Sequence, residues 1–453
     1  KNDLAASLGA LVFAIHPIHI EAVSWVSAAN ELFYTIFVLG SLLLLQESRD
    51  DSWDKKSYGA LILWAAALFL KETAVVLLAV FAFLTWAKLE TLKETGHCGK
   101  VAALRSIPWI VAAGIYLGLR TIVLQRSGLE SGKQSWGEAL LSAPGLVEFY
   151  LRKLVLPWHL SSFYYEDLTT NPGIRMWVAV LLIVSLILVL VWAAHKGHGS
   201  IALSGALVAL PLLPVLGGLR IYERGSIAHD RYLYLPSAGL CLFVGIVVDK
   251  FSTKVLRQKS LSTGIGTIIA CASIYLCLSQ QLWYMNDRAY YYRAVELYPQ
   301  NFLVWEFWGR FDLTHKNPKE GLEELTRAHQ LAPENPNVDY YYARALFENG
   351  RYVEAEPLLE QLSNRSEQKK GRREILLLAL GQTEMRLGRF LESENTLNRL
   401  SQMDSAFPGL HNTFGNLYQL EGKLGVASAE FMKEFELTGD FRSKKQAIAL
   451  GAR

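Results

Sequence analysis

The chain has 453 residues, of which 51% are hydrophobic and 19% are charged, and its mean hydropathy is +0.19. Soluble domains carry about 25% charged residues, so this composition argues against a wholly soluble globular enzyme. A net charge of +3 without a long basic run predicts no nucleic-acid partner. The cysteines lack C-x-x-C spacing, so the sequence predicts neither a bound metal nor a disulfide framework.

Charge is divided unevenly along the chain. Of the 45 basic and 42 acidic residues, 46 follow Asn286, although this part is little more than a third of the length. The first 285 residues are nearly as apolar as protein that faces lipid. The two parts therefore belong in different solvents, and we expect a transmembrane domain over residues 1–285 and a soluble domain over residues 286–453.

Apolar runs of about 17–25 residues cross a bilayer whose hydrocarbon core is about 30 Å thick. The segment Ala139–Pro157 is apolar but carries Glu148, Arg152 and Lys153, so we expect it to lie in the interface. About nine other runs are expected to span, of which the first four are short and need tilting or snorkelling ends. The expected spans are Leu4–Ile18, Leu32–Gln46, Tyr58–Leu70, Thr73–Ala87, Ile107–Leu124, Met176–Ala194, Ile201–Leu219, Tyr232–Val248 and Leu261–Tyr284.

Lysine and arginine collect in two loops, one from Lys88 to Arg105 and one from Lys250 to Lys259. The positive-inside rule places both loops in the cytoplasm, and nine alternating spans satisfy this. The same alternation puts three polar segments together on the extracytoplasmic face, namely residues 16–21, 71–73 and 229–236. A crossing by Ala139–Pro157 would invert everything after it.

After Asn286 the sequence repeats with a period near 34 residues, which is typical of tetratricopeptide repeats. Small residues recur where two helices of a hairpin touch, and large residues fill the space between them. Four copies are in register, with a short insertion around Lys369–Arg373 before the third. Their repeated positions are Trp308, Gly309, Gly321 and Leu325; Tyr342, Ala343, Ala355 and Leu359; Leu380, Gly381, Ser393 and Leu397; and Phe414, Gly415, Ala427 and Phe431.

Four segments in order carry a family resemblance. They are FAIHPIHIEAVSW at residues 13–25, which contains HPIHIE at 16–21, then KETA at 71–74, YLRKLVLP at 150–157 and DRYLYLPS at 230–237. The repeats follow these segments. This arrangement resembles the transmembrane and tetratricopeptide-repeat protein O-mannosyltransferases and their bacterial relatives. The resemblance implies an all-α, GT-C type membrane helix bundle with about nine spans in this chain, followed by a tetratricopeptide-repeat α-solenoid.

The resemblance also implies an activity, which is transfer of a sugar from a polyprenyl- or dolichyl-phosphate carrier to an acceptor on the extracytoplasmic face. Mannose is the expected sugar, a protein or peptide on the repeats is the expected acceptor, and no tightly bound cofactor is expected. Related enzymes keep a catalytic acid in a first extracytoplasmic loop, and this chain begins where the third span is expected. We therefore expect the chain to be a fragment without its own general base, and its catalytic residue to be unknown.

Seven residues are predicted to bind the lipid phosphate and sugar of the donor: His16, His19, Glu21, Lys71, Glu72, Asp230 and Arg231. Imidazole and carboxylate groups at a membrane surface are costly unless they are paired, solvated or used. Arg231 offers planar donors for the leaving phosphate, and Asp230 is expected to orient Arg231 or the sugar hydroxyls. The alternatives are interfacial histidines after Pro17, a charged turn at Lys71 and Glu72, and a snorkelling pair at Asp230 and Arg231.

Two functions from different classes follow from this sequence. One is the glycosyltransferase, and the other is a non-catalytic membrane-anchored scaffold whose repeats dock partner proteins. For localisation, a bacterial cytoplasmic membrane with periplasmic repeats is favoured over an endoplasmic reticulum membrane with luminal repeats. In the second setting the sequon Asn364-Arg-Ser366 would be open to glycosylation.

Overall fold

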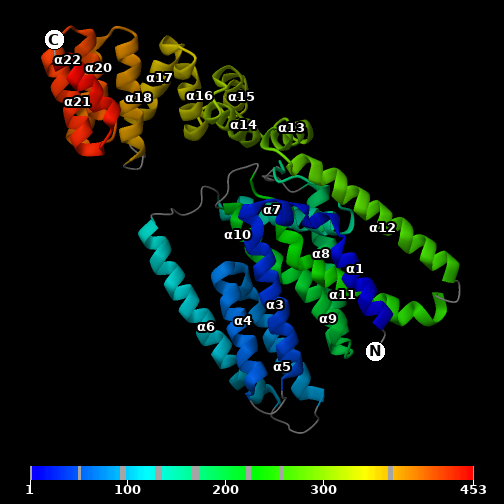
Figure 1. The fold of residues 1–453 in the computed structure, drawn as a ribbon. Helices are drawn as coiled ribbons and strands as arrows, with labels where there is room; N and C mark the ends of the chain where they lie inside the picture. Colours follow the sequence, from blue (N-terminus) through cyan, green and yellow to red (C-terminus); the bar gives the residue numbers. More distant parts are fainter. Residues whose placement is uncertain are drawn as a thin grey trace. The chain divides into compact units, whose positions relative to one another are not determined.

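The computed structural model describes residues 3–48, 53–91, 98–127, 135–165, 173–220, 226–255, 259–365 and 371–451. Every regular element in these ranges is helical, which confirms the predicted all-α class (Figure 1). Contacts divide the chain into two compact units, Lys1–Tyr298 and Pro299–Arg453.

The first unit consists of long apolar helices joined by short ones. Its α-helices are α1 Asp3–Ala14, α2 Ile20–Ser24, α3 Ala29–Glu47, α4 Lys55–Leu70, α5 Leu78–Thr91, α6 Cys98–Ser127, α7 Trp136–Val155, α8 Ile174–His195, α9 Gly199–Ala209, α10 Leu213–Gly217, α11 Tyr234–Val255, α12 Lys259–Gln281 and α13 Asp287–Leu297. Its 3₁₀ helices are η1 Pro17–His19, η2 Val26–Ala28, η3 Glu72–Leu77, η4 Leu210–Leu212, η5 Gly218–Arg220, η6 Asp230–Leu233 and η7 Leu282–Tyr284.

Five helical segments among the described residues are long and apolar enough to cross a membrane: Val26–Glu47, Ala103–Val123, Met176–His195, Gly199–Gly218 and Asp230–Lys250. Two bent pairs raise the number to seven, and these pairs begin at Ala5 and at Thr267. By this criterion the described residues contain up to seven of the nine expected spans. The two expected spans that fall short lie in α4, which has 16 residues, and in the segment Glu72–Leu84, which begins as a 3₁₀ helix.

The first bent pair is explained by one proline. Pro17 lacks an N–H and disfavours helical geometry in the residue before it, so α1 ends at Ala14 and His16 is extended (φ −71°, ψ 123°). The chain then resumes as η1 and α2 at 44° to α1. This break presents the polar side chains of residues 16–21 at the end of an apolar helix.

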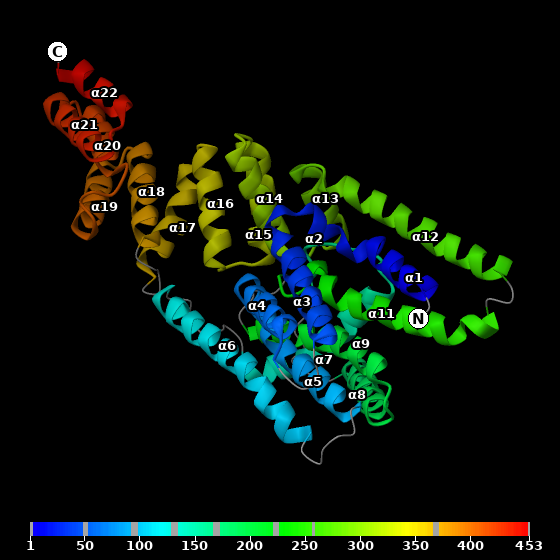
Figure 2. The same cartoon turned by 60° about the horizontal axis from the view of Figure 1, so that its bottom comes forward.

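Two apolar cores hold the first unit together. In the first, α3, α4, α5 and α6 pack around Trp64, which is fully buried, and the rings of Phe81 and Trp109 stack at 4.3 Å. The second core joins α7 to the segments around Ile18 and Leu233. The helices α3 and α4 run side by side in both views (Figure 2). The outward faces of α6 and α8 carry exposed leucine, isoleucine and valine, as lipid-facing helices do.

The segment around Ala139–Pro157 forms one helix, α7. A capping box starts it, because Ser135 Oγ accepts from the N–H of Glu138 and the Glu138 side chain accepts from the N–H of Ser135. It is not among the candidate spans of the described residues. Its position in the interface stays a prediction, as does the orientation from the two basic loops, which lie partly outside the described residues.

The second unit is a solenoid of four helical hairpins and a final helix. Its helices are α14 Phe302–Thr314, α15 Pro318–Leu331, α16 Pro336–Glu348, α17 Tyr352–Asn364, α18 Arg372–Arg386, α19 Phe390–Met403, α20 Leu410–Leu420, α21 Leu424–Thr438 and α22 Phe441–Gly451. The repeats are confirmed at their large positions, because Leu325, Leu359, Leu397 and Phe431 are all buried. Gly309 lets α14 and α15 touch, since a Cβ there would lie 2.5 Å from Leu325.

Candidate functional site

The candidate site is built on an ion pair between the two most specific motifs. Arg231 Nη1 donates to Glu21 Oε1 at 2.6 Å, and the backbone N–H of Arg231 donates to Glu21 Oε2 at 3.0 Å. Glu21 lies on α2, which follows the break at Pro17, and Arg231 lies on η6, which directly precedes the apolar helix α11. The side chain of Glu21 is fully buried and that of Arg231 is 18% exposed, so the carboxylate holds the guanidinium at the edge of the protein.

Aromatic rings flank this guanidinium. The Cζ atom of Arg231 lies 4.8 Å from the ring centroid of Trp25 and 5.2 Å from that of Tyr232. Cation–π contacts fix the plane of the group without using its N–H donors. The bond to Glu21 uses Nη1, and the planar fork carries further N–H donors suited to an oxyanion.

Asp230 is held by partners other than Arg231. One carboxylate oxygen accepts from the Tyr164 hydroxyl at 2.6 Å, and the other accepts from the N–H of Ser161 at 3.0 Å. Adjacent residues of a tight turn point in different directions, so Asp230 ties the 161–164 segment to η6 while Glu21 orients Arg231. Asp230 is 2% exposed.

The histidines are held by specific hydrogen bonds. His16 Nε2 donates to the carbonyl of Leu154 at 3.1 Å and its Nδ1 accepts from the N–H of Ile18 at 3.3 Å, so both ring nitrogens are engaged. The Ser237 hydroxyl donates to the carbonyl of Tyr234, so His19 Nε2 donates to Ser237 Oγ at 2.7 Å. The two histidines therefore brace the motif segments in this structure.

Lys71 joins the same cluster, and Glu72 does not. Lys71 Nζ pairs with Glu31 and lies 4.7 Å from the ring centroid of Tyr232, next to Arg231 in the chain. The side chains of Lys71 and Glu31 are 11% and 3% exposed. Glu72 instead points outward, where Arg120 Nη1 lies 3.3 Å from its carboxylate and both side chains are well exposed.

Sequence reasoning missed Glu31, a charged member of this cluster, and the burial of Lys153, which lies outside the cluster. Glu31, the partner of Lys71, opens the apolar helix α3 and resembles an ordinary polar helix start. Lys153 is 4% exposed and donates to the carbonyls of Trp158 and His159. Each of these two residues interrupts an otherwise apolar run, and this pattern could have indicated a buried charge. Two further cations before the 230–237 segment, Arg224 and the side chain of Arg220, lie outside the described residues.

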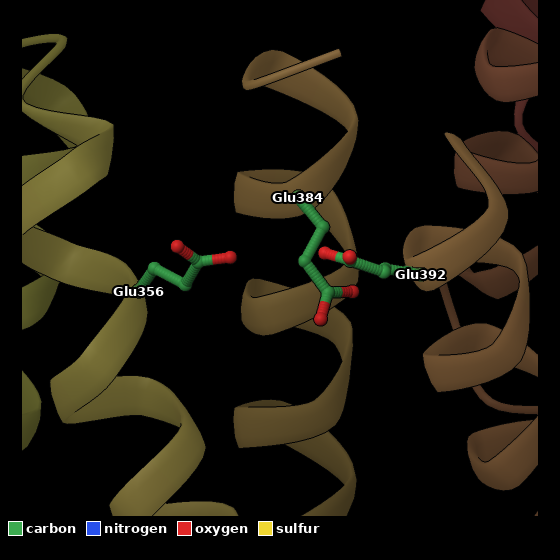
Figure 3. A group of neighbouring side chains, drawn as sticks. All are labelled: Glu356, Glu384 and Glu392. Atoms are coloured by element: carbon green, nitrogen blue, oxygen red, sulfur yellow. The ribbon is translucent and has the colours of Figure 1, made fainter. Parts of the chain in front are cut away.

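Three glutamates of the second unit could hold a cation by their geometry. Carboxylate oxygens of Glu356, Glu384 and Glu392 lie within 4.8 Å of one another, and Figure 3 shows the side chains converging from three helices. Arg389 Nη1 already lies 2.5 Å from Glu356 and 3.6 Å from Glu392. Burial, together with these two neighbouring glutamates, raises the pKa of Glu384 to about 7, while a hydrogen bond from Thr396 opposes the shift.

The solenoid also has a groove between consecutive repeats. A cavity of about 280 Å³ lies between α16 and α18 and is lined by Tyr340, Arg344, Phe347, Ile375 and Gln382 among others. Aromatic, aliphatic, charged and amide groups therefore meet in one depression. Such a surface suits an extended peptide, whose backbone and side chains present the same mixture of groups.

Comparisons with known proteins agree with the motifs. Residues 313–373 match the family model described as tetratricopeptide repeat. Human "Protein O-mannosyl-transferase TMTC4" is 22% identical over 329 residues, which cover 63% of this chain and 44% of that protein. The resemblance to the protein O-mannosyltransferases is confirmed. Human "Protein O-mannosyl-transferase TMTC3" is 21% identical over 389 residues, covering 78% of this chain and 42% of that protein.

This chain spans less than half the length of these curated relatives. Among solved structures, the tetratricopeptide-repeat protein YrrB has 16% sequence identity and a TM-score of 0.32, and the match covers 37% of this chain and 84% of that one. Together with the candidate spans, the relatives identify an integral membrane protein with a tetratricopeptide-repeat region.

Proposed function

We propose that the chain is the donor-binding and acceptor-presenting part of a membrane glycosyltransferase. The donor is a sugar, expected to be mannose, on a polyprenyl or dolichyl phosphate, and the acceptor is a protein on the extracytoplasmic face. One observation carries the proposal: the Glu21–Arg231 pair fixes a partly exposed guanidinium at the mouth of apolar helices. A lipid-borne phosphate needs a cation at that depth.

The chemistry requires a cation at the leaving group. The bond between the anomeric carbon and the phosphate oxygen breaks, its electron pair stays on the phosphate, and the acceptor oxygen bonds to the carbon while a base removes its proton. Negative charge grows on the phosphate as the bond breaks. Preorganised donors aimed at growing charge give large rate effects, and Arg231 is held in this manner by Glu21.

Lys71 supplies a second positive charge within the same cluster. It is held by Glu31 and lies over the ring of Tyr232 on the side of η6. We propose that Arg231 and Lys71 contact the phosphate and that Glu21, His16 and His19 position the two motif segments. Asp230 fixes the 161–164 segment beside them, and Glu72 contributes at the rim, where it is exposed.

The groove between α16 and α18 supports a role for the repeats in binding the acceptor protein. The same groove also supports the second candidate, a membrane-anchored scaffold with no chemistry of its own. The buried charge cluster separates the two, because a scaffold gains nothing from the cost of burying Glu21, Glu31 and Asp230 in a membrane domain. We favour a bacterial cytoplasmic membrane over the endoplasmic reticulum.

The test is sugar transfer in membranes that contain the full-length protein and labelled polyprenyl-phosphate mannose. Arg231→Gln is expected to lower transfer by about 10²–10³-fold, as loss of one charge-stabilising donor does. Arg288→Gln removes an exposed arginine of the same unit, on α13, and should leave transfer unchanged. Equal transfer by both variants would remove Arg231 from the mechanism, and no transfer by the wild type would favour the scaffold.

A further inference from the structure

A second cationic site lies at the end of α7, in the YLRKLVLP segment, whose function the transfer reaction does not explain. A cavity of about 290 Å³ opens there, and Arg152, Lys153 and His159 lie on its wall. None of the described residues that line it is acidic. A phosphate and the glycerol attached to it fit a space of this size.

Hydrogen bonds shape this cavity. Lys153 Nζ donates to the carbonyl oxygens of Trp158 and His159, which folds the chain after α7 back over the helix end. His159 adopts the positive φ of 50° that this fold requires. Arg152 projects beside the turn with a side chain 44% exposed, and its Nε donates to Glu148 at 3.1 Å. The guanidinium of Arg152 therefore lies at the opening of this cavity.

The rim of the cavity has the composition of a membrane interface. Val155, Leu156 and Trp158 are all more than 60% exposed. Trp and apolar side chains next to Arg and Lys are typical of the boundary between headgroups and acyl chains. The planar fork of an arginine suits a phosphate group, so a basic pocket with such a rim suits an anionic headgroup.

The cavity is separate from the Glu21–Arg231 cluster. Its wall residue Phe149 packs on Tyr164 at 4.8 Å between ring centroids, and Lys153 Nζ lies 4.8 Å from the centroid of the same Tyr164 ring. On its far side the Tyr164 hydroxyl donates to Asp230. One aromatic residue therefore divides the two sites, and occupancy of one does not fill the other.

We propose that this cavity binds the phosphate of an anionic membrane lipid, with Arg152 as the main contact and the acyl chains lying along Leu156 and Trp158. Arg152 is shared between Glu148 and the lipid, so the carboxylate competes with the phosphate for one guanidinium. Removing Glu148 should strengthen binding, whereas removing Arg152 should weaken it. The proposal does not depend on the transferase activity.

The experiment places the full chain in phosphatidylcholine vesicles that contain increasing fractions of phosphatidate with brominated acyl chains. Bromine quenches nearby tryptophan, and the signal of Trp158 is the difference between the wild type and Trp158→Phe. Quenching is expected to saturate at a low fraction of phosphatidate. Loss of one charge-assisted bond to phosphate corresponds to about a tenfold change, so Arg152→Gln should need about ten times more phosphatidate for half-quenching.

Matched variants keep the result independent of folding. Arg152→Lys keeps the charge and should retain most of the binding, and Glu148→Gln should lower the half-quenching fraction about two- to threefold. Lys196→Gln removes an exposed cation outside the cavity, after α8, and should shift the fraction less than twofold. A Glu148→Gln variant that weakens binding would overturn the proposal.

Two further arms identify the source of the phosphate. Brominated phosphatidylcholine should quench Trp158 without saturation and equally in all variants. Equal, saturable quenching by both lipids would overturn recognition of an anionic headgroup. Inorganic phosphate at about 20 mM should leave the phosphatidate curve unchanged; full displacement by it would show a site for free phosphate and overturn the lipid assignment.

Discussion

Glu21 and Arg231 are separated by 210 positions in sequence, and both oxygens of the glutamate bind the arginine, one through Nη1 and one through its backbone N–H. This double contact locks α2 to η6 and therefore fixes how two membrane helices approach each other. Because the carboxylate of Glu21 is fully buried, the membrane unit stays stable only while Arg231 balances its charge.

Double-mutant analysis of this pair should show strong coupling. Arg231→Met leaves Glu21 buried without its cation and is expected to destabilise the membrane unit by about 3–5 kcal/mol. The double variant Arg231→Met/Glu21→Gln should recover more than half of the loss, since no lone charge remains. Thermal unfolding in detergent measures both. Additive effects of the two substitutions would show that the pair does not act as a unit.

The Lys71–Glu31 pair gives a second prediction with a sharper control. Lys71→Met is expected to be more destabilising than Lys71→Met/Glu31→Gln, because Glu31 is 3% exposed and cannot reach water easily. Lys56→Met, in the exposed pair of Lys56 with Glu47, should change stability by less than about 1 kcal/mol. A loss at Lys56 as large as that at Lys71 would contradict the importance of burial.

The repeats should lose stability as the pH rises toward 7. Burial raises the pKa of Glu384 to about 7 from an ordinary value of 4.5, so the folded chain binds this proton more tightly than the unfolded chain. The contribution of Glu384 therefore becomes less favourable between about pH 4.5 and 7 and is constant above that.

Glu384→Gln removes this dependence and should stabilise α18 above pH 7, where the carboxylate would otherwise be charged beside Glu356 and Glu392. Hydrogen exchange of peptides from α18 and α19 in the full chain, corrected for the intrinsic effect of pH, measures it. Exchange in Glu384→Gln that keeps the pH dependence of the wild type would show that another group is responsible.

The close contact between α14 and α15 at Gly309 predicts that adding one methyl group there lowers the stability of the first repeat. A Cβ at position 309 would lie 2.5 Å from Leu325 Cγ and 3.0 Å from the carbonyl oxygen of Gly321, so Gly309→Ala should cost about 1–3 kcal/mol. Gly425→Ala is the control, because nothing lies within 4 Å of its Cβ, and it should stabilise by about 0.4–1 kcal/mol. Thermal unfolding of the full chain that ranks them in the opposite order would refute the packing argument.

The sequence was most informative where residue type and spacing act together. The 34-residue period predicted four hairpins because Gly309, Gly381 and Gly415 recur where helices must touch. The motifs at residues 16–21 and 230–237 were predicted to lie together on one face of the membrane domain, and Glu21 and Arg231 of these segments are in contact. Hydropathy could not show that α4 has only 16 residues or that the segment after it begins as a 3₁₀ helix at Glu72, because a window average hides both features.

Side-chain direction was beyond the sequence. Asp230 and Arg231 are adjacent, and their sequence suggested one functional pair. In the structure they point to different partners, Tyr164 and Glu21, because successive residues of a 3₁₀ turn project about a third of a turn apart. Glu31 was missed for a related reason, since only its contact with Lys71 distinguishes it from a solvated helix start.

We expect the Glu21–Arg231 cluster and the repeats to share the extracytoplasmic compartment. Single cysteines at Val26, which is 88% exposed beside the cluster, and at Leu391, 72% exposed on α19, test it in a cysteine-free background. A membrane-impermeant thiol reagent added outside should label both, and a cysteine at Lys250 should react only after the membrane is opened. Labelling of Val26→Cys and Leu391→Cys from opposite sides would place the cluster and the repeats in different compartments and would contradict this expectation.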